Sequence, residues 1–118
     1  MPILTLTCVG DVPEGAAQRL SDRLGTYWRT EPGRVWVRLL RLAPEDYAEN
    51  DVLPLPGKWP VFVQVLHREP PTGDALAAEA CALTLVVAEV LARPAERVHV
   101  SYDPAARGRQ WFGGVAVR

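Results

Sequence analysis

Two stretches of this 118-residue sequence decide its fold: MPILTLTCVGDVPEG at residues 1–15 and WPVFVQVLHREPPTG at residues 59–73. Each continues from a proline into a short apolar and β-branched run, which predicts a β-strand. The stretches match at a constant offset of 58 residues, and this indicates an internal duplication. The alternative explanation is that any two β-α-β units have the same order of elements. It predicts no constant offset between matching residues. The matched pairs are Pro2/Pro60, Ile3/Val61, Asp11/Glu69, Pro13/Pro71 and Gly15/Gly73.

A helix is expected after each of these strands. Asp11 and Glu14 form a capping-box-like start for the first helix, which the pair Pro32-Gly33 ends. Thr72 is the expected N-cap of the second helix, which ends at Arg93-Pro94. Its apolar stripe consists of Leu76, Ala80, Leu83, Val87, Val90 and Leu91. After the helices the offset between the halves grows to 63, so the second helix should be about one turn longer.

The expected strands cover residues 3–8, 35–42, 60–67 and 97–102, and a hairpin around Gly113-Gly114 covers 110–117. Residues 43–58 form a surface excursion with at most one helical turn. We therefore predict one α/β domain over residues 1–118, with halves at about 2–42 and 60–102. Its four-stranded mixed sheet carries both helices on one face. The other face would be uncovered, which predicts an oligomer.

Composition excludes several classes of function. The formal net charge of −1 gives no basic field for nucleic acid, and no apolar run is long enough to span a membrane. Cys8 and Cys81 are too few for a disulfide framework, and we interpret both as reduced core thiols of a cytoplasmic protein. No spacing of His, Cys, Asp or Glu suggests a metal site, and no cofactor motif is present.

The beginning Met1-Pro2, the doubled β-α-β order and the stretch RPAERVHVSY at residues 93–102 together resemble the tautomerase superfamily. The longer branch, typified by macrophage migration inhibitory factor and malonate semialdehyde decarboxylase, is the more similar one, and Trp111 falls near a tryptophan of that family. The resemblance implies a homotrimer with active sites between subunits and an N-terminal proline as catalyst.

Pro2 is the expected catalytic residue. Removal of Met1 would make it a secondary amine, whereas a retained Met1 leaves an amide without basicity. A free α-amine titrates near ~7.7–8, and burial or a nearby arginine lowers this value. Such an amine can move a proton between carbon and oxygen of a 2-oxo acid at neutral pH.

A small carboxylate substrate would need cationic and polar partners. Arg68 resembles an arginine of malonate semialdehyde decarboxylase, but Pro70 stands where that subgroup has a second arginine, which argues against decarboxylation. His99 and Ser101 stand where the inhibitory factor has tyrosine and asparagine. The other expected substrate-binding residues are Arg38, Arg109 and Trp111. The alternative for each arginine is a solvated surface charge, and for His99 a hydrogen-bonded packing role.

The predicted function is that of a cofactor-independent tautomerase, an isomerase acting on a small 2-oxo (enol) carboxylic acid. One alternative is a non-catalytic trimer that serves as a binding or assembly module. Another is a related decarboxylase or hydratase, and a hydratase needs a carboxylate that activates water. Glu45, Asp46 and Glu49 are available, but nothing in the sequence selects one of them.

Overall fold

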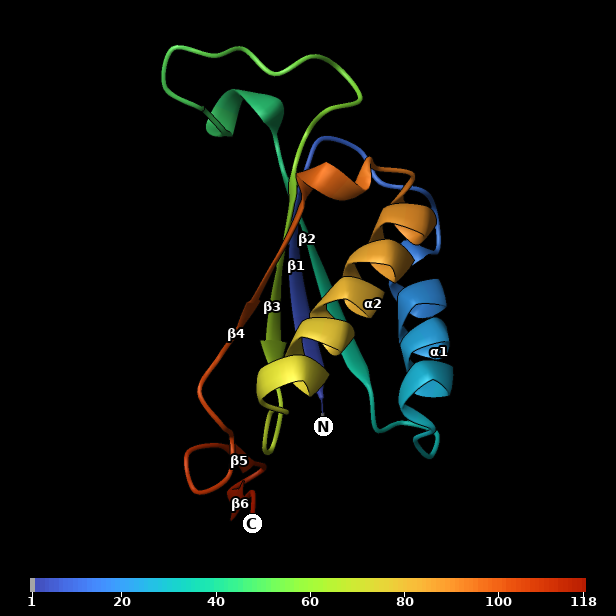
Figure 1. Ribbon diagram of the computed structural model, residues 1–118, viewed down its shortest axis with the longest axis vertical. Helices are drawn as coiled ribbons and strands as arrows, with labels where there is room; N and C mark the ends of the chain where they lie inside the picture. The colour runs from blue at the N-terminus through green and yellow to red at the C-terminus, as the bar shows by residue number, and fades with distance from the viewer. Residues whose placement is uncertain (1) are drawn as a thin grey trace.

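The computed structural model describes residues 2–118 and has the predicted α/β elements in the predicted order (Figure 1). The first half contains β1 (Ile3–Val9), α1 (Ala16–Trp28) and β2 (Trp36–Leu42). The second half contains β3 (Val61–Leu66), α2 (Gly73–Leu91) and β4 (Val98–Tyr102). A hairpin of β5 (Trp111–Phe112) and β6 (Val115–Ala116) follows, and single 3₁₀ turns occupy η1 (Pro44–Asp46) and η2 (Ala95–Arg97).

The four long strands form one sheet in the order β2-β1-β3-β4. β1 is parallel to β2, β3 is parallel to β4, and the two halves meet through the antiparallel pair β1 and β3. Both helices cover the same face of this sheet, as the right-handed crossover of each half requires (Figure 1). The predicted mixed sheet with helices on one face is therefore confirmed.

Alternate residues of each strand face the helices and form the core. Leu4 and Leu6 of β1 and Val63 of β3 are at most 1% exposed, and they pack with Leu20 of α1 and Leu83 of α2. This two-residue period on the strands and the helical period on α1 and α2 are the patterns that the sequence displays. α2 has 19 residues and α1 has 13, so the difference exceeds the single turn expected.

Two local expectations need correction, and a third is confirmed. Asp11 and Glu14 do not cap α1, because the helix begins only at Ala16, after Gly15 at φ 73°, and its N-cap makes no side-chain hydrogen bond. Thr72 is the N-cap residue of α2, as predicted, although its side chain makes no capping hydrogen bond. Cys8 is buried as expected, whereas Cys81 is exposed.

The uncovered sheet face, here called the open face, alternates apolar and polar rows. Trp36, Leu40 and Phe62 point to it and are 50%, 55% and 39% exposed. The strand register aligns Arg38, Thr5, Gln64 and Ser101 in a polar row across all four strands. Trp36 and Arg38 thus share one face, as predicted. Exposed apolar side chains gathered on one face are typical of a surface that contacts another protein.

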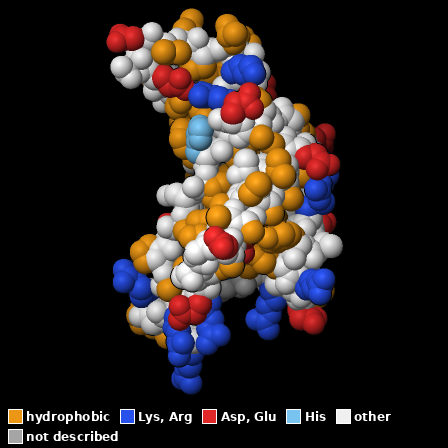
Figure 2. Space-filling view, viewed as in Figure 1, with side chains coloured by type: hydrophobic (Ala, Val, Ile, Leu, Met, Phe, Trp, Pro, Cys, Tyr) orange, Lys and Arg blue, Asp and Glu red, His pale blue; other side chains and the backbone are white. Residues whose placement is uncertain are grey.

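Residues 43–59 form an arm that projects beyond the end of the sheet (Figure 1). Two arginines of the connection between α2 and β4 bind the base of the arm: Arg93 donates to the Trp59 carbonyl oxygen at 2.8 Å and Arg97 to the Lys58 carbonyl oxygen at 2.7 Å. The arm contains one 3₁₀ turn, as the sequence predicts. In the space-filling view the molecule is hollowed between this arm and the hairpin (Figure 2). Within residues 2–118, no helix has both the length and the apolar character needed to cross a bilayer.

Candidate functional site

Pro2 lies at the head of β1 and is buried. Its carbonyl oxygen accepts a hydrogen bond from the Trp36 backbone N–H at 3.2 Å, which extends the parallel β1–β2 pairing to the beginning of the strand. Pro2 is therefore held in the sheet at a fixed place next to the start of β2.

A pocket of about 370 Å³ adjoins this end of β1 on the open face. Ile3, the residue after Pro2, forms part of its wall, and the rings of Trp36 and Phe112 meet edge to face with centroids 5.3 Å apart. Arg34 is the charged residue of the lining. The pocket is lined by Ile3, Gly33, Arg34, Trp36, Phe112, Val115, Ala116 and Val117.

The C-terminal hairpin closes one side of this pocket. Its two-residue turn consists of Gly113 and Gly114, both at positive φ (56° and 86°), which matches the right-handed twist of the flanking strands. Because neighbouring strand residues point to opposite sides, Phe112 enters the pocket wall while Trp111 is 56% exposed and not part of the lining. Phe112 and Arg34 are thus pocket residues that the sequence analysis did not select.

The predicted substrate-binding residues on the open face lie farther along the sheet. The Arg38 guanidinium donates through Nε and Nη2 to Thr5 Oγ1, at 3.1 and 2.8 Å, and Ser101 lies in the same polar row. His99 is level with Thr7, four residues along β1 from Ile3, which corresponds to about 13 Å. One chain therefore does not bring His99 to Pro2.

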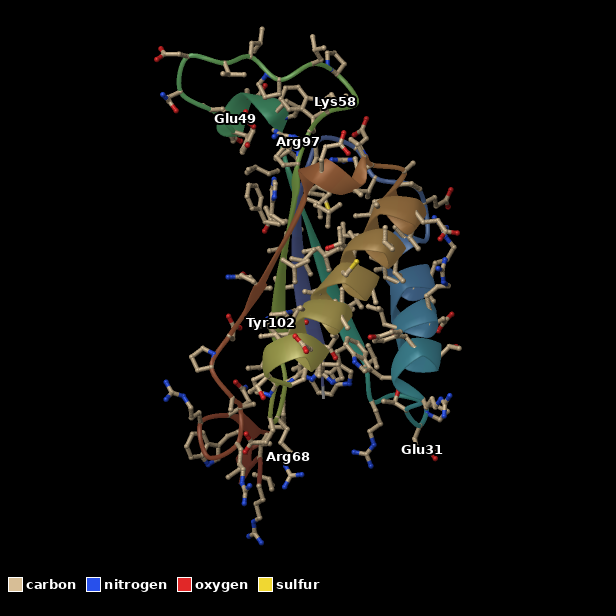
Figure 3. All side chains as sticks on the ribbon, viewed as in Figure 1. Glu31, Glu49, Lys58, Arg68, Arg97 and Tyr102 are labelled. Carbon is tan, nitrogen blue, oxygen red and sulfur yellow. The ribbon has the colours of Figure 1, made fainter. Side chains whose placement is uncertain are left out.

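Arg68, labelled in Figure 3, lies near the hairpin end of the molecule, where basic side chains gather (Figure 2). Arg109 lies two residues before β5. The Arg68 carbonyl oxygen accepts the Arg107 backbone N–H at 3.2 Å, so the segment after β3 adjoins the loop before β5. Arg107 also lies 3.5 Å from a carboxylate oxygen of Glu69, with both side chains exposed. Neither Arg68 nor Arg109 lines the pocket, and their role in binding a carboxylate stays a prediction.

A second cluster lies at the opposite end of the open face, between the arm and the start of β4 (Figure 3). Glu49 Oε2 forms an ion pair with Arg97 and accepts a hydrogen bond from the Tyr47 hydroxyl at 2.5 Å. These two bonds hold the pKa of the Glu49 carboxyl below its usual range, and the charge of His99 adds to the effect. The ring of Phe62 connects Tyr47 and His99, with centroid distances of 6.1 and 5.5 Å. Of the three acidic residues Glu45, Asp46 and Glu49, Glu49 is thus the one whose carboxylate is bonded to an arginine and a tyrosine.

A third cluster surrounds Glu79, the buried charged residue of α2, which is 7% exposed. Glu79 Oε1 accepts the Trp28 indole N–H at 2.7 Å, and Oε2 accepts the Tyr102 hydroxyl at 2.7 Å and lies 2.9 Å from His67 Nε2. Burial by itself raises the pKa of the Glu79 carboxyl, but these hydrogen bonds outweigh burial and lower it. Burial, with the bond to Glu79, raises the pKa of Tyr102.

Glu79 could have been found in the sequence, because it lies three residues after Leu76 and four before Leu83, in the middle of the apolar stripe. Across residues 2–118, no three His, Cys, Asp or Glu side chains are arranged to hold a metal ion.

No family model matches this chain, and no curated protein matches it by sequence. Solved structures do match it over nearly the whole chain. Macrophage migration inhibitory factor from Oncomelania hupensis is 17% identical, with a TM-score of 0.77 over 100% of this chain and 83% of that chain. A protein called Pt0534, inactivated by 2-oxo-3-pentynoate, is 16% identical, with a TM-score of 0.73 over 97% of this chain and 95% of that chain.

FG41 malonate semialdehyde decarboxylase, inhibited by 3-bromopropiolate, is 14% identical, with a TM-score of 0.63 over 94% of this chain and 90% of that chain. A fused 4-OT protein, solved as a symmetric trimer, has a TM-score of 0.72 at 18% identity, over 97% of this chain and 94% of that chain. At these identities the likeness concerns the fold. The chain has the fold of the tautomerase superfamily, and the predicted resemblance is confirmed.

Proposed function

We propose that this protein is a cofactor-independent tautomerase that interconverts the enol and keto forms of a small 2-oxo carboxylic acid, with Pro2 as the general base. The observation that carries the proposal is the placement of Pro2 at the end of the sheet, where its carbonyl oxygen is bonded to the backbone of Trp36, a residue that lines a pocket with aromatic walls and an arginine. Arg34 would receive the substrate carboxylate, and the rings of Trp36 and Phe112 would contact its side chain.

In the proposed reaction, the unprotonated amine of Pro2 takes a proton from the carbon next to the keto group. The electron pair of that C–H bond moves toward the carbonyl, and the ammonium returns the proton to the oxygen to give the enol. A positioned acid–base group of this kind contributes a factor of ~10²–10⁴ to the rate.

The assembly that we propose is a homotrimer acting in the cytoplasm. The exposed apolar side chains of the open face support an oligomer, and the similar fused 4-OT protein is a trimer. A neighbouring subunit would bring His99 and Ser101 toward Pro2, which one chain cannot do. Sedimentation velocity at micromolar concentration tests the trimer, and a stable monomer would refute it.

The catalytic proposal is tested by the state of the N-terminus and by turnover. Intact-mass spectrometry should show that Met1 is removed, and the protein should then convert phenylpyruvate-like enol acids to their keto forms. The electrophile 2-oxo-3-pentynoate should alkylate Pro2 by addition of the amine nitrogen to its triple bond. Peptide mapping that finds no adduct on Pro2, together with no turnover of several 2-oxo acids, would favour the non-catalytic trimer.

The Glu49 cluster supports a second candidate function, the addition of water to an unsaturated acid. Glu49 uses Oε2 for both Arg97 and Tyr47, and no hydrogen bond within residues 2–118 involves Oε1. An ionised carboxylate with one oxygen fixed and the other available can accept a proton from water. Glu49→Gln should abolish hydration while leaving enol–keto conversion intact, and a loss of both activities would contradict this separation.

A further inference from the structure

Glu79 carries a buried charge whose neighbours are mostly neutral. Its carboxylate accepts bonds from Trp28 and Tyr102, which are uncharged donors, and within the described part of the chain no lysine or arginine is paired with it. Burial of a carboxylate costs free energy, and an apolar side chain of similar size would fill the same space without this cost. Perturbed, buried acids of this kind occur preferentially where a protein needs their charge.

The strand register connects this cluster to Pro2. Ile3 is opposite Leu66 in the antiparallel pair of β1 and β3, so the next pair outward is Pro2 and His67. The side chains of Leu4 and Val65 face the helices. Pro2 lies two residues before Leu4, and His67 lies two residues after Val65. Pro2 and His67 therefore follow directly on the outermost pair of β1 and β3, and if the alternation of the two strands continues, both lie on the helix side at this end of the sheet.

The bond to Glu79 also fixes the proton on the His67 ring. Because the Glu79 carboxylate can only accept, His67 Nε2 donates to it, at 2.9 Å. In the tautomer with the hydrogen on Nε2, Nδ1 carries no hydrogen and can act as an acceptor. No hydrogen bond to Nδ1 arises from residues 2–118, so this nitrogen can accept a hydrogen bond from a neighbouring donor. The ring itself is held between Trp28, edge to face at 5.4 Å, and Tyr102, stacked at 6.1 Å.

We propose that Glu79 is a positioning residue for Pro2, which acts through His67 to orient the proline and to raise the proton affinity of its amine. His67 Nδ1 accepts a hydrogen bond from the Pro2 ammonium, and the Glu79 carboxylate stabilises the resulting positive charge. This inference rests on the proposed function only in taking Pro2 as the reactive group.

Other charged groups at this end of the sheet act on the same amine. Tyr102 of β4 donates to Glu79 and stays neutral, while Arg34 of the pocket and Arg68 after β3 oppose protonation of the amine by their positive charge. The carboxylate of Glu79 is the buried charge among them, and buried charges are the least screened by salt. Removal of the Glu79 charge should therefore change the pKa of the Pro2 amine more than removal of any other charge at this end of the sheet.

The experiment measures the amine directly and without substrate. Protein beginning at Pro2 is labelled with ¹³C-proline, and the Cα and Cδ signals are followed against pH; of the 11 prolines, only Pro2 carries a titrating amine. Glu79→Gln should lower the amine pKa by about 0.5–1 unit. Glu89→Gln removes an exposed carboxylate of the same helix and should leave the pKa of the Pro2 amine unchanged.

His67→Gln provides a second variant, since glutamine can still donate to Glu79 but has no counterpart of Nδ1. It should also lower the amine pKa, and it decides the matter if Glu79→Gln does not fold. An amine pKa that equals the wild-type value in every folded variant would overturn the proposal. Because the titration needs no turnover, an inactive wild type would refute the proposed function without affecting this result.

Discussion

Glu79→Met is the substitution whose effect on stability can be worked out furthest from the structure. Methionine nearly matches glutamate in length but removes the acceptor of three hydrogen bonds, from Trp28, His67 and Tyr102. Hydrogen bonds to a charged group contribute ~1.5–3 kcal/mol each, and the desolvation of the carboxylate offsets a large part of their sum. Each buried donor left without its acceptor costs about 1–3 kcal/mol, and after the offset from desolvation we expect a net loss of about 3 kcal/mol.

The assay is urea unfolding followed by tryptophan fluorescence, with all variants at one protein concentration, because assembly would couple stability to concentration. Glu89→Met is the matched control: Glu89 is on the same helix, 70% exposed, and paired with Arg23 at 3.2 Å. An exposed pair is worth less than about 1 kcal/mol, so the control should unfold almost as the wild type does. Equal stability of Glu79→Met and Glu89→Met would refute the importance of the network.

The same comparison has a pH dependence with a defined sign. The pKa of the folded Glu79 carboxyl lies below its ordinary value. Its contribution to stability is therefore fully present above the unfolded-state value of ~4.3 and is lost as the pH falls through the folded-state pKa. The difference in unfolding free energy between wild type and Glu79→Met should be larger at pH 6 than at pH 3. A difference that grew below pH 4 would contradict the assignment of an ionised carboxylate.

Three further predictions concern the N-terminus, the arginines and the cysteines. A variant with one residue added before Pro2 keeps every side chain but converts the amine to an amide, so its turnover should fall at least ~10²-fold, and unchanged turnover would exclude proline catalysis. Arg34→Gln should raise the KM for a carboxylate substrate more than Arg68→Ala or Arg109→Ala, since Arg34 lines the pocket, and equal effects would assign substrate binding elsewhere. Cys81 is exposed and should react with a thiol reagent in the native protein, whereas Cys8, buried and with a raised pKa, should react only on unfolding; simultaneous reaction of both would contradict the core packing.

Much of the fold could be predicted because its signals are local and periodic. The alternation in Val61, Val63 and Val65 identifies the buried face of β3, and the two glycines at 113–114 identify the hairpin turn. The start of α1 was mispredicted because Asp11 and Glu14 have the spacing of a capping box, whereas the backbone at Gly15 turns into the helix at positive φ without a side-chain cap.

The candidate site was less predictable because its residues meet through long-range contacts. Glu49 lies in an irregular arm, and only the folded arm brings it to Arg97, 48 residues later. Phe112 enters the pocket wall in place of Trp111 because of the hairpin register, which composition does not reveal. Glu79 interrupts an apolar stripe, and its position was a signal that helical periodicity alone could have supplied.

The two ends of the sheet differ in a way that follows from chain chemistry. Pro2 and Pro60 occupy equivalent positions in the two halves, and both are buried. Pro60 follows Trp59, so its nitrogen is an amide nitrogen that cannot accept a proton, and only Pro2 can become an amine. At the Pro2 end the sheet adjoins a pocket and a buried carboxylate, while the other end is covered by the arm and closed by the pair of Glu49 and Arg97. At the Pro2 end, acid–base chemistry is therefore available through the backbone amine, and at the arm end only through side chains. The variants at Glu79 and Glu49 test these two ends independently.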